Sequence, residues 1–510
     1  MHIPSGVPRG DAATYLHRAY VAVSSGNIPW EGYFSSSDLG HPGPILLWVL
    51  AAGTYIGKTF GAAAAYIIAT STCIAMAGRY IRSCTGSWAG GVAVLAATAW
   101  IWRSNPHSPY GSLQLGIHIG PMYGPNFAAA LTLVGMAAAV AALSTKKLGA
   151  AIAATILGGF MFQASIETVP FGLIVSGVGA WTILSNKKKG AWKILPWGLG
   201  AGYFPFLVRM IRDGIDLPLR YIESVVSVRN ADRGGGRSDT LQTILHGIYG
   251  GGGMLQIWLA ITIMAGIIVY TSRKTRAALI LLTGAGGLAL AIAAWFVSYG
   301  HQISSMIAYP ILLGGVAIGV LHQKLRRGGR YLAMAVAIPI IYISAGGTMQ
   351  MWEGRDVYLT TEEYEPLTKA LVEPKKAPRV GIISSENQLR LREILGAVRP
   401  YEMYMALVGA GYEYCTHNQT YDRETGIHSC QEDPPDQWII IDLEQQDGGN
   451  YISVWQANPQ EGETRPLYVR TQLRPELETA GFIYCENLGM SWVHDPLQRG
   501  SCPETIQQAD

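Results

Sequence analysis

The near absence of acidic side chains over most of the chain is the feature that most constrains its fold. Only six Asp and Glu residues occur between His41 and Trp352. They are Glu167, Asp213, Asp216, Glu223, Asp232 and Asp239. This part of the sequence contains apolar runs of the length that a helix needs to cross about 30 Å of hydrocarbon. Charged residues make up 14% of the chain, against roughly 25% in soluble domains. We therefore expect a polytopic membrane protein.

The apolar runs predict about ten transmembrane helices, so the expected fold class is mainly α. The runs lie near Ala62–Ala77, Ala89–Trp102, Phe127–Leu143, Leu148–Phe162, Val169–Leu184, Leu195–Met210, Gln256–Tyr270, Ala277–Val297, Ser305–Leu321 and Tyr331–Ala345. The net charge of +3 comes with no basic stripe of interleaved aromatic residues. This argues against a nucleic-acid partner.

The basic residues predict the orientation of the bundle. Lys and Arg gather in every second connection, and the positive-inside rule assigns these connections to the cytoplasm. They contain Arg79, Arg82, Lys146, Lys147, Lys187, Lys188, Lys189, Lys193, Arg273, Lys274, Arg276, Lys324, Arg326, Arg327 and Arg330. All six acidic residues of the membrane part then lie on the extracytoplasmic side, together with the region after Gly346.

One apolar run, Ile45–Phe60, breaks this alternation if it is counted as a crossing. We expect it to lie along the outer membrane surface or to enter the membrane as a re-entrant helix, with Pro42-Gly43-Pro44 at its start. The domain boundaries follow from these runs. We predict an exported N-terminal segment with juxtamembrane helices (1–61), a multi-span domain (62–346), a linker (347–378) and an exported α/β domain (379–510).

The α/β domain is predicted from short apolar runs, with Val380 to Ser385 and Trp438 to Asp442 as central strands. Four of the six cysteines lie in this domain, and an oxidising compartment would pair them as two disulfides. They are Cys415, Cys430, Cys485 and Cys502. Three pairings are open, of which Cys415–Cys430 with Cys485–Cys502 is the local one. A zinc site is the alternative, although no Cys-x-x-Cys spacing is present.

Two motifs in the N-terminal segment resemble a known family. Gly10-Asp11 is followed by an amphipathic stretch and then by Gly40-His41-Pro42-Gly43-Pro44, which leads into the outward-lying helix. This order resembles the GT-C superfamily of polyprenyl-phosphate-sugar-dependent glycosyltransferases, in the branch of protein O-mannosyltransferases and lipid A aminoarabinose transferases. Gly10-Asp11 stands in place of the family's acidic motif, and the second motif in place of its His-Pro-Pro box. The loop Phe162 to Pro170 looks like a family loop that faces the donor site.

The resemblance covers roughly the first 180 residues and implies a function. The expected donor is a polyprenyl-phosphate sugar made in the cytoplasm, and the acceptor is a hydroxyl of a glycan, lipid or protein. Transfer would take place at the outer face of a membrane, with the bacterial inner or plasma membrane as the expected location.

Two carboxylates are the candidate catalytic residues. Asp11 is the expected base, because a partly desolvated carboxylate at the membrane face can accept the acceptor's proton. Glu167 is an acid between Ile166 and Thr168 in a short connection near hydrocarbon, where an acidic residue is costly and usually functional or paired. Asp38 and His41 would act either as ligands of a divalent metal or as hydrogen bonders.

The candidate substrate-binding residues lie in segments assigned to the exported side. They are Arg9, Arg18, Asp38, His41, Arg103, His107, Arg229, Arg233, Arg237 and His301. The arginines would hold the departing phosphate, since guanidinium groups bind phosphate oxygens in bidentate fashion.

Other interpretations of the same residues remain open. Asp11 is also a suitable N-cap for the helix expected over Ala12–Val23, and His41 would then be an ordinary residue at a helix entry. A transporter or flippase of lipid-linked sugars would also have about ten spans, but it should carry paired charges within spans or an inverted repeat, and neither is evident. A non-catalytic membrane scaffold with an exported binding domain is the third reading.

Overall fold

The computed structural model divides into two compact units, and each is described by itself. One unit comprises Asn27–Gly354, and the other comprises Met1–Gly26 with Arg355–Asp510. The structure describes residues 7–8, scattered positions between 15 and 32, 42–103, 124–186, 190–221, 223, 263–296, 305, 308–324, 358–359, 379–384, 413–416, 437–446, 449–458, 463–466, 482–485 and 491–494.

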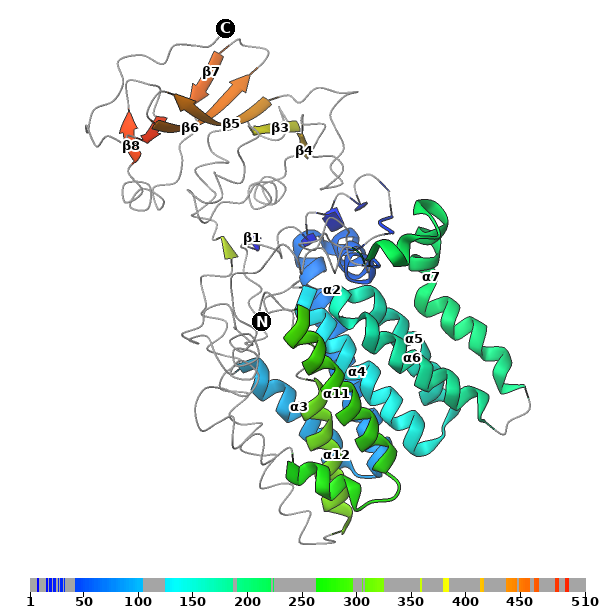
Figure 1. Cartoon of the computed structure of the whole chain (residues 1–510). Coiled ribbons are helices and arrows are strands. Elements are labelled where there is room, and N and C mark those ends of the chain that lie inside the picture. The colour runs from blue at the N-terminus through cyan, green and yellow to red at the C-terminus, as the bar shows by residue number, and fades with distance from the viewer. Residues whose placement is uncertain are drawn as a thin grey trace. The chain divides into compact units, whose positions relative to one another are not determined.

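The described part of the first unit is a bundle of apolar helices (Figure 1). The helices are α2 (Ile45–Thr85), α3 (Trp88–Arg103), α4 (Gly124–Thr145), α5 (Leu148–Ala164), α6 (Val169–Leu184), α7 (Leu195–Asp213), α11 (Arg276–Phe296) and α12 (Ala308–Lys324), with the 3-10 helices η1 (Ile166–Thr168) and η2 (Ala191–Ile194). Four of the described helices are long and apolar enough to cross a membrane: α2, α4, α6 with η1, and α7 with η2. The predicted polytopic helical bundle is confirmed.

Most predicted runs coincide with these helices. The run near Gln256–Tyr270 is described only from residue 263, where it is helical, and the run near Tyr331–Ala345 lies outside the described residues. The short connection after α5 is tighter than expected, because Gln163 still belongs to α5 and Val169 already begins α6. Only Ser165 and the single turn of η1 separate the two helices.

Helix α2 consists of two helices that meet at a corner. Gly57 and Lys58 have non-helical backbone angles, and Lys58 has a φ of 49°. Gly53 and Gly61 approach each other so closely that a Cβ on either would collide with the backbone of the other. Residues eight positions apart in a straight helix are about 12 Å apart, so the chain turns sharply here. The break at Gly57 and Lys58 separates Ile45–Phe60 from most of the span that follows, while its predicted position along the membrane surface stays a prediction.

Small residues allow α5, α6 and α7 to pack closely. A Cβ on Gly158 of α5 would lie 2.5 Å from the carbonyl oxygen of Gly172 in α6, and one on Gly159 would lie 2.5 Å from the Cα of Gly202 in α7. Lipid is as apolar as a leucine side chain, so helices in membranes associate through such close contacts rather than through the hydrophobic effect.

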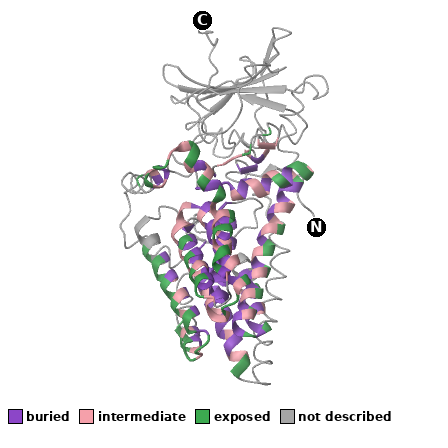
Figure 2. Ribbon diagram, turned by 90° about the vertical axis from the view of Figure 1, so that its right-hand side faces the viewer, coloured by how far each residue is buried: buried purple, intermediate pink, exposed green. Residues whose placement is uncertain are grey.

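Helix α4 is the central helix of the bundle, and α7 is peripheral. Nearly every residue of α4 from Phe127 to Ala142 is buried, whereas Trp197 and Ile211 of α7 are 81% and 87% exposed. Figure 2 shows the buried residues gathered where the helices face one another and the exposed ones on the outward faces. The apolar outward faces fit a lipid environment.

The connections rich in lysine and arginine lie together at one end of the bundle. Their contacts join Asn186 Nδ2 to the carbonyl of Lys146 at 3.4 Å, Ser87 Oγ to His322 Nδ1 at 2.9 Å, Cys84 Sγ to Ser144 Oγ at 3.1 Å, and Lys324 Nζ to Thr271 Oγ1 at 2.7 Å. Glu167, Asp213 and Asp216 follow or precede the other ends of the same helices. This segregation of charge agrees with the orientation predicted from the basic residues.

The second unit contains a mixed sheet of seven strands in the order β4-β3-β5-β6-β9-β8, with β7 also paired to β6. The strands are β3 (Arg379–Ser384), β4 (Glu413–Thr416), β5 (Gln437–Gln446), β6 (Gly449–Asn458), β7 (Glu463–Pro466), β8 (Phe482–Cys485) and β9 (Ser491–His494). The predicted central strands are β3 and β5, which pair in parallel with Gly381 opposite Trp438. A separate pair joins β1 (Val7–Pro8) to β2 (Tyr358–Leu359).

Two of the four predicted disulfide cysteines are on described strands. Cys415 lies on β4 and Cys485 on β8, at opposite edges of the sheet. Five strand spacings of about 4.8 Å separate these edges, far beyond the distance that a disulfide spans. One of the three pairings, Cys415 with Cys485, is therefore excluded. Cys430 and Cys502 lie outside the described residues, and the described residues contain no disulfide.

Candidate functional site

Glu167 lies in the turn between α5 and α6, at the end of the bundle away from the basic connections. It belongs to η1 and accepts a hydrogen bond from the hydroxyl of Ser165. Thr168 closes the turn, because its hydroxyl donates to the carbonyls of Met161 at 2.5 Å and Ser165 at 2.8 Å. A carboxylate removed from water needs such a partner to remain charged. The turn therefore presents one half-buried, oriented carboxylate.

The turn is joined to the motif before α2 through Gln163. The backbone N–H of Gly43 donates to the carbonyl of Gln163 at 3.2 Å, and a Cβ on Gly43 would lie 2.5 Å from Cγ of Gln163. The buried side chain of Gln163 donates through Nε2 to the carbonyl of Gly202 in α7. The described end of the predicted motif, Pro42-Gly43-Pro44, and the Glu167 turn are thereby brought side by side.

Aromatic side chains surround the same end of the bundle. The Trp30 ring lies edge-on to Trp48 of α2 and to Phe204 of α7, with centroids 5.8 Å apart in both pairs. The indole N–H of Trp48 donates to the carbonyl of Pro29 at 2.8 Å. These contacts fix Pro29 and Trp30 against α2 and α7.

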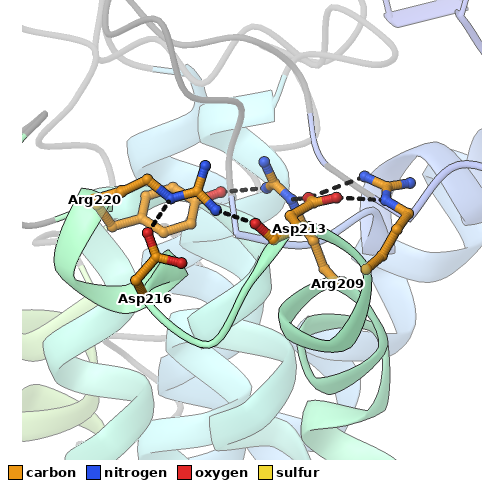
Figure 3. A network of polar contacts seen from close by, with 6 residues as sticks. Arg209, Asp213, Asp216 and Arg220 are labelled. Atoms are coloured by element: carbon orange, nitrogen blue, oxygen red, sulfur yellow. Dashed lines mark hydrogen bonds and ion pairs between the residues drawn. The ribbon is translucent and has the colours of Figure 1, made fainter.

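A network of arginines and aspartates follows at the end of α7 (Figure 3). Arg209 is only 4% exposed, and its Nε donates to Oδ2 of Asp213 at 2.9 Å. The same carboxylate accepts from Arg212 at 2.6 Å. Beyond the bend at Gly214, Arg220 lies 3.1 Å from Asp216 and donates to the backbone carbonyl of Asp213. Gly214 has a φ of 114°, which only glycine adopts without strain.

An apolar cluster connects this network to the Glu167 turn. Phe206, Leu217 and Tyr221 are buried together, with Phe162, Ile166 and Met210 packed against them. Phe162 and Ile166 flank the segment from Gln163 to Ser165, directly before Glu167. The carboxylate turn, the Gly43 contact and the arginine network therefore form one continuous region.

The structure places only part of the predicted site. Glu167 is described with its contacts, Arg18 lies in a helical stretch of the other unit, and Arg103 is the last residue of α3. The remaining predicted residues lie outside the described residues: Arg9, Asp11, Asp38, His41, His107, Arg229, Arg233, Arg237 and His301.

Three residues of this region were not singled out from the sequence, namely Gln163, Arg209 and Tyr221. Gln163 is a polar residue in the last turn of an apolar helix, which is a signal that could have been used. The contact of Arg209 with Tyr221 could not be foreseen from the sequence, because Tyr221 reaches Arg209 only through the bend at Gly214.

A metal site finds no support among the residues that the structure describes. No group of three or more His, Cys, Asp or Glu side chains gathers there, and the candidate ligands Asp38 and His41 are not among them.

Comparison with known proteins gives matches at the level of structure. No protein-family model matches the sequence, and no curated protein matches it. The crystal structure of ArnT from Cupriavidus metallidurans in the apo state is similar, with a TM-score of 0.52, 11% identity, and coverage of 98% of this chain and 96% of that chain. The same protein bound to undecaprenyl phosphate gives a TM-score of 0.51, with the same identity and coverage.

The oligosaccharyltransferase AglB from Archaeoglobus fulgidus aligns with a TM-score of 0.36 and 13% identity over 95% of this chain and 76% of that chain. This score is too low for a structural argument. The similarity to ArnT, a GT-C lipid A aminoarabinose transferase, extends over nearly the whole of both chains. The chain has the fold of the GT-C superfamily.

Proposed function

We propose that the chain is a membrane glycosyltransferase of the hexosyl or pentosyl type. It transfers a sugar from a polyprenyl-phosphate donor to an acceptor hydroxyl at the extracytoplasmic face. The GT-C fold alone does not establish this, because one fold hosts many functions. The observation that carries the proposal is the hydrogen bond between Gly43 and Gln163. It joins Gly43 of the predicted motif to the helix end that leads into the Glu167 turn, at the end of the bundle away from the basic connections.

The choice of a lipid-phosphate donor has two supports. One of the similar ArnT structures is bound to undecaprenyl phosphate, and the motif before α2 resembles that of enzymes with such donors. A lipid-linked donor also suits a site where a helical bundle reaches the membrane surface. There the lipid chain can stay in the bilayer while the phosphate and sugar enter the site.

In the proposed reaction Asp11 accepts the proton of the acceptor hydroxyl. The acceptor oxygen bonds to the anomeric carbon of the sugar, the bond from that carbon to the phosphate oxygen breaks, and the polyprenyl phosphate leaves with the electron pair. Glu167, held by Ser165, accepts a hydrogen bond from the sugar or the acceptor. General base catalysis of this kind contributes about 10²- to 10⁴-fold to a rate.

The leaving phosphate gains negative charge and needs cations in place. The proposed groups are the arginines predicted for the exported segments, namely Arg9, Arg18, Arg103, Arg229, Arg233 and Arg237. His107 and His301 are proposed to contact the sugar or the acceptor. The C-terminal unit, which we place outside the cytoplasm, is proposed to shape acceptor recognition.

A transfer assay tests this proposal. Membranes that contain the chain are incubated with a panel of radiolabelled polyprenyl-phosphate sugars, and labelled product is compared between the wild type and Asp11→Asn. We expect transfer from at least one donor and its loss in Asp11→Asn at equal protein level. If the wild type transfers none of the sugars, the proposed activity is wrong. If Asp11→Asn transfers as well as the wild type, the assigned base is wrong.

A further inference from the structure

The buried arginine at the end of α7 suggests a role beyond closing the helix. Arg209 is 4% exposed and shares its carboxylate partner, Asp213, with the half-exposed Arg212. Removing a guanidinium and a carboxylate from water is costly, and such pairs often add no net stability compared with apolar residues. The Arg209–Asp213 ion pair does hold the Arg209 guanidinium in a fixed position. The other contacts of this guanidinium therefore show which side chain it positions.

Tyr221 is the group that Arg209 holds. Nη1 of Arg209 donates to the hydroxyl of Tyr221, and the guanidinium carbon lies 5.5 Å from the centre of the ring. The bend at Gly214 carries the chain back so that Tyr221, twelve residues after Arg209, reaches it. Leu217, within this returning segment, is fully buried.

Tyr221 in turn belongs to the apolar cluster against which Phe162 and Ile166, on either side of the Gln163–Ser165 segment, are packed. Its ring lies 6.3 Å from Phe206, whose ring lies 4.8 Å from Phe162 of α5. Ile166, the residue before Glu167, packs against the same cluster. Two ring contacts therefore connect Tyr221 to Phe162, and the cluster reaches Ile166, the residue directly before Glu167.

We infer that Arg209 and Tyr221 are positioning residues that hold the Glu167 turn in its productive place. This inference rests on the proposed function, because it assumes that Glu167 contacts the reacting groups. Arg209 fixes the Tyr221 ring through a charge-assisted hydrogen bond, and the ring is part of the cluster against which Phe162 and Ile166 pack. A displacement of about 1 Å at a catalytic group can cost 10²-fold in rate, so support of this kind matters for turnover.

The test uses the full-length protein in detergent micelles and compares three proteins. Tyr221→Phe keeps the ring and its packing but removes the hydroxyl that Arg209 donates to. Arg212→Gln is the matched control, since Arg212 binds the same Asp213 but its side chain is half-exposed, unlike that of Arg209. Hydrogen–deuterium exchange of the peptide that covers residues 163–168 reports on the turn, and kcat and KM for the donor report on catalysis.

We expect faster exchange of the 163–168 peptide in Tyr221→Phe, and a fall in kcat of about tenfold with little change in KM, as for a lost hydrogen bond to a charged group. Arg212→Gln should match the wild type in both readouts. Unchanged exchange in Tyr221→Phe overturns the inference, and so does faster exchange with wild-type kcat. If the wild type has no transferase activity, the proposed function fails, and the exchange result alone decides whether Arg209 and Tyr221 hold the turn.

Discussion

At the scale of single residues, Gly43 and Gln163 decide whether the two halves of the candidate site meet. Three atoms of the Gln163 side chain lie within 2.7 Å of where a Gly43 Cβ would stand. The Gln163 side chain cannot easily move aside, because it is buried and bonded to the carbonyl of Gly202. Glycine at position 43 is thus required by the close approach of Gln163.

We predict that Gly43→Ala lowers the stability of the protein by about 1–3 kcal/mol, the usual cost of overpacking a filled site. The measurement is the midpoint of thermal unfolding in detergent. Gly149→Ala is the control, since nothing lies within 4 Å of a Cβ there, and it should not lower the midpoint. The double variant Gly43→Ala with Gln163→Gly removes the clashing atoms and should recover part of the loss. Equal midpoints for Gly43→Ala and Gly149→Ala would show that the contact is not tight.

The sequence identified Glu167 but not its supports, and the reason is physical. An acid between apolar spans is costly wherever it lies, so composition alone marks it. Arg209 lies near the end of an apolar helix, where arginine is common as an interfacial anchor. Its burial depends on the left-handed bend at Gly214 and on the ring of Tyr221, which are tertiary features.

At the scale of elements, apolar length predicted the helices well, because a span must satisfy its own backbone hydrogen bonds. The length of an apolar stretch does not specify which helices contact one another. The crossing of α5 with α7 depends on Gly159 and Gly202, two glycines among the 61 of this chain. Only the structure distinguishes them from glycines such as Gly200, which faces no neighbour within 4 Å.

We expect Gly159→Ala to force α7 away from α5 and to lower the thermal midpoint by several degrees, because the new Cβ would lie 2.5 Å from the Cα of Gly202. Backbone atoms cannot move aside as a flexible side chain can. Gly200→Ala, on the outward side of the same crossing, should be neutral or slightly stabilising, since alanine favours a helix by about 1 kcal/mol over glycine. If Gly159→Ala has the same thermal midpoint as the wild type, α5 and α7 do not cross as closely as described.

At the scale of the whole molecule, the acidic residues of the described bundle lie away from the lysine- and arginine-rich connections, although Arg209, Arg212 and Arg220 lie with them. The basic connections gather at one end, and Glu167 and Asp213 lie toward the other. This pattern could be predicted from the sequence because it depends on which connections contain lysine and arginine, and not on how the helices pack. The strand order of the second unit could not be predicted in the same way, since it depends on pairings between distant segments such as β6 with β9.

Fusions to alkaline phosphatase, which is active only outside the cytoplasm, test the orientation. We expect activity for a fusion after Asp510 and none for a fusion after Lys188, because the first follows the proposed extracytoplasmic unit and the second lies in a basic connection. The reverse pattern would place Glu167 on the cytoplasmic side and would contradict the proposed site of transfer.

The most direct test of the whole account is the transfer rate of Glu167→Gln in reconstituted vesicles, with a donor that the wild type accepts. We predict a fall of about 10- to 100-fold at equal protein level, the usual loss when a hydrogen bond to a charged group is removed. Asp216→Asn is the matched control, because its carboxylate is 59% exposed in the same end of the bundle, and it should stay within about twofold of the wild type, as for a surface ion pair. A Glu167→Gln protein as active as Asp216→Asn would contradict the account.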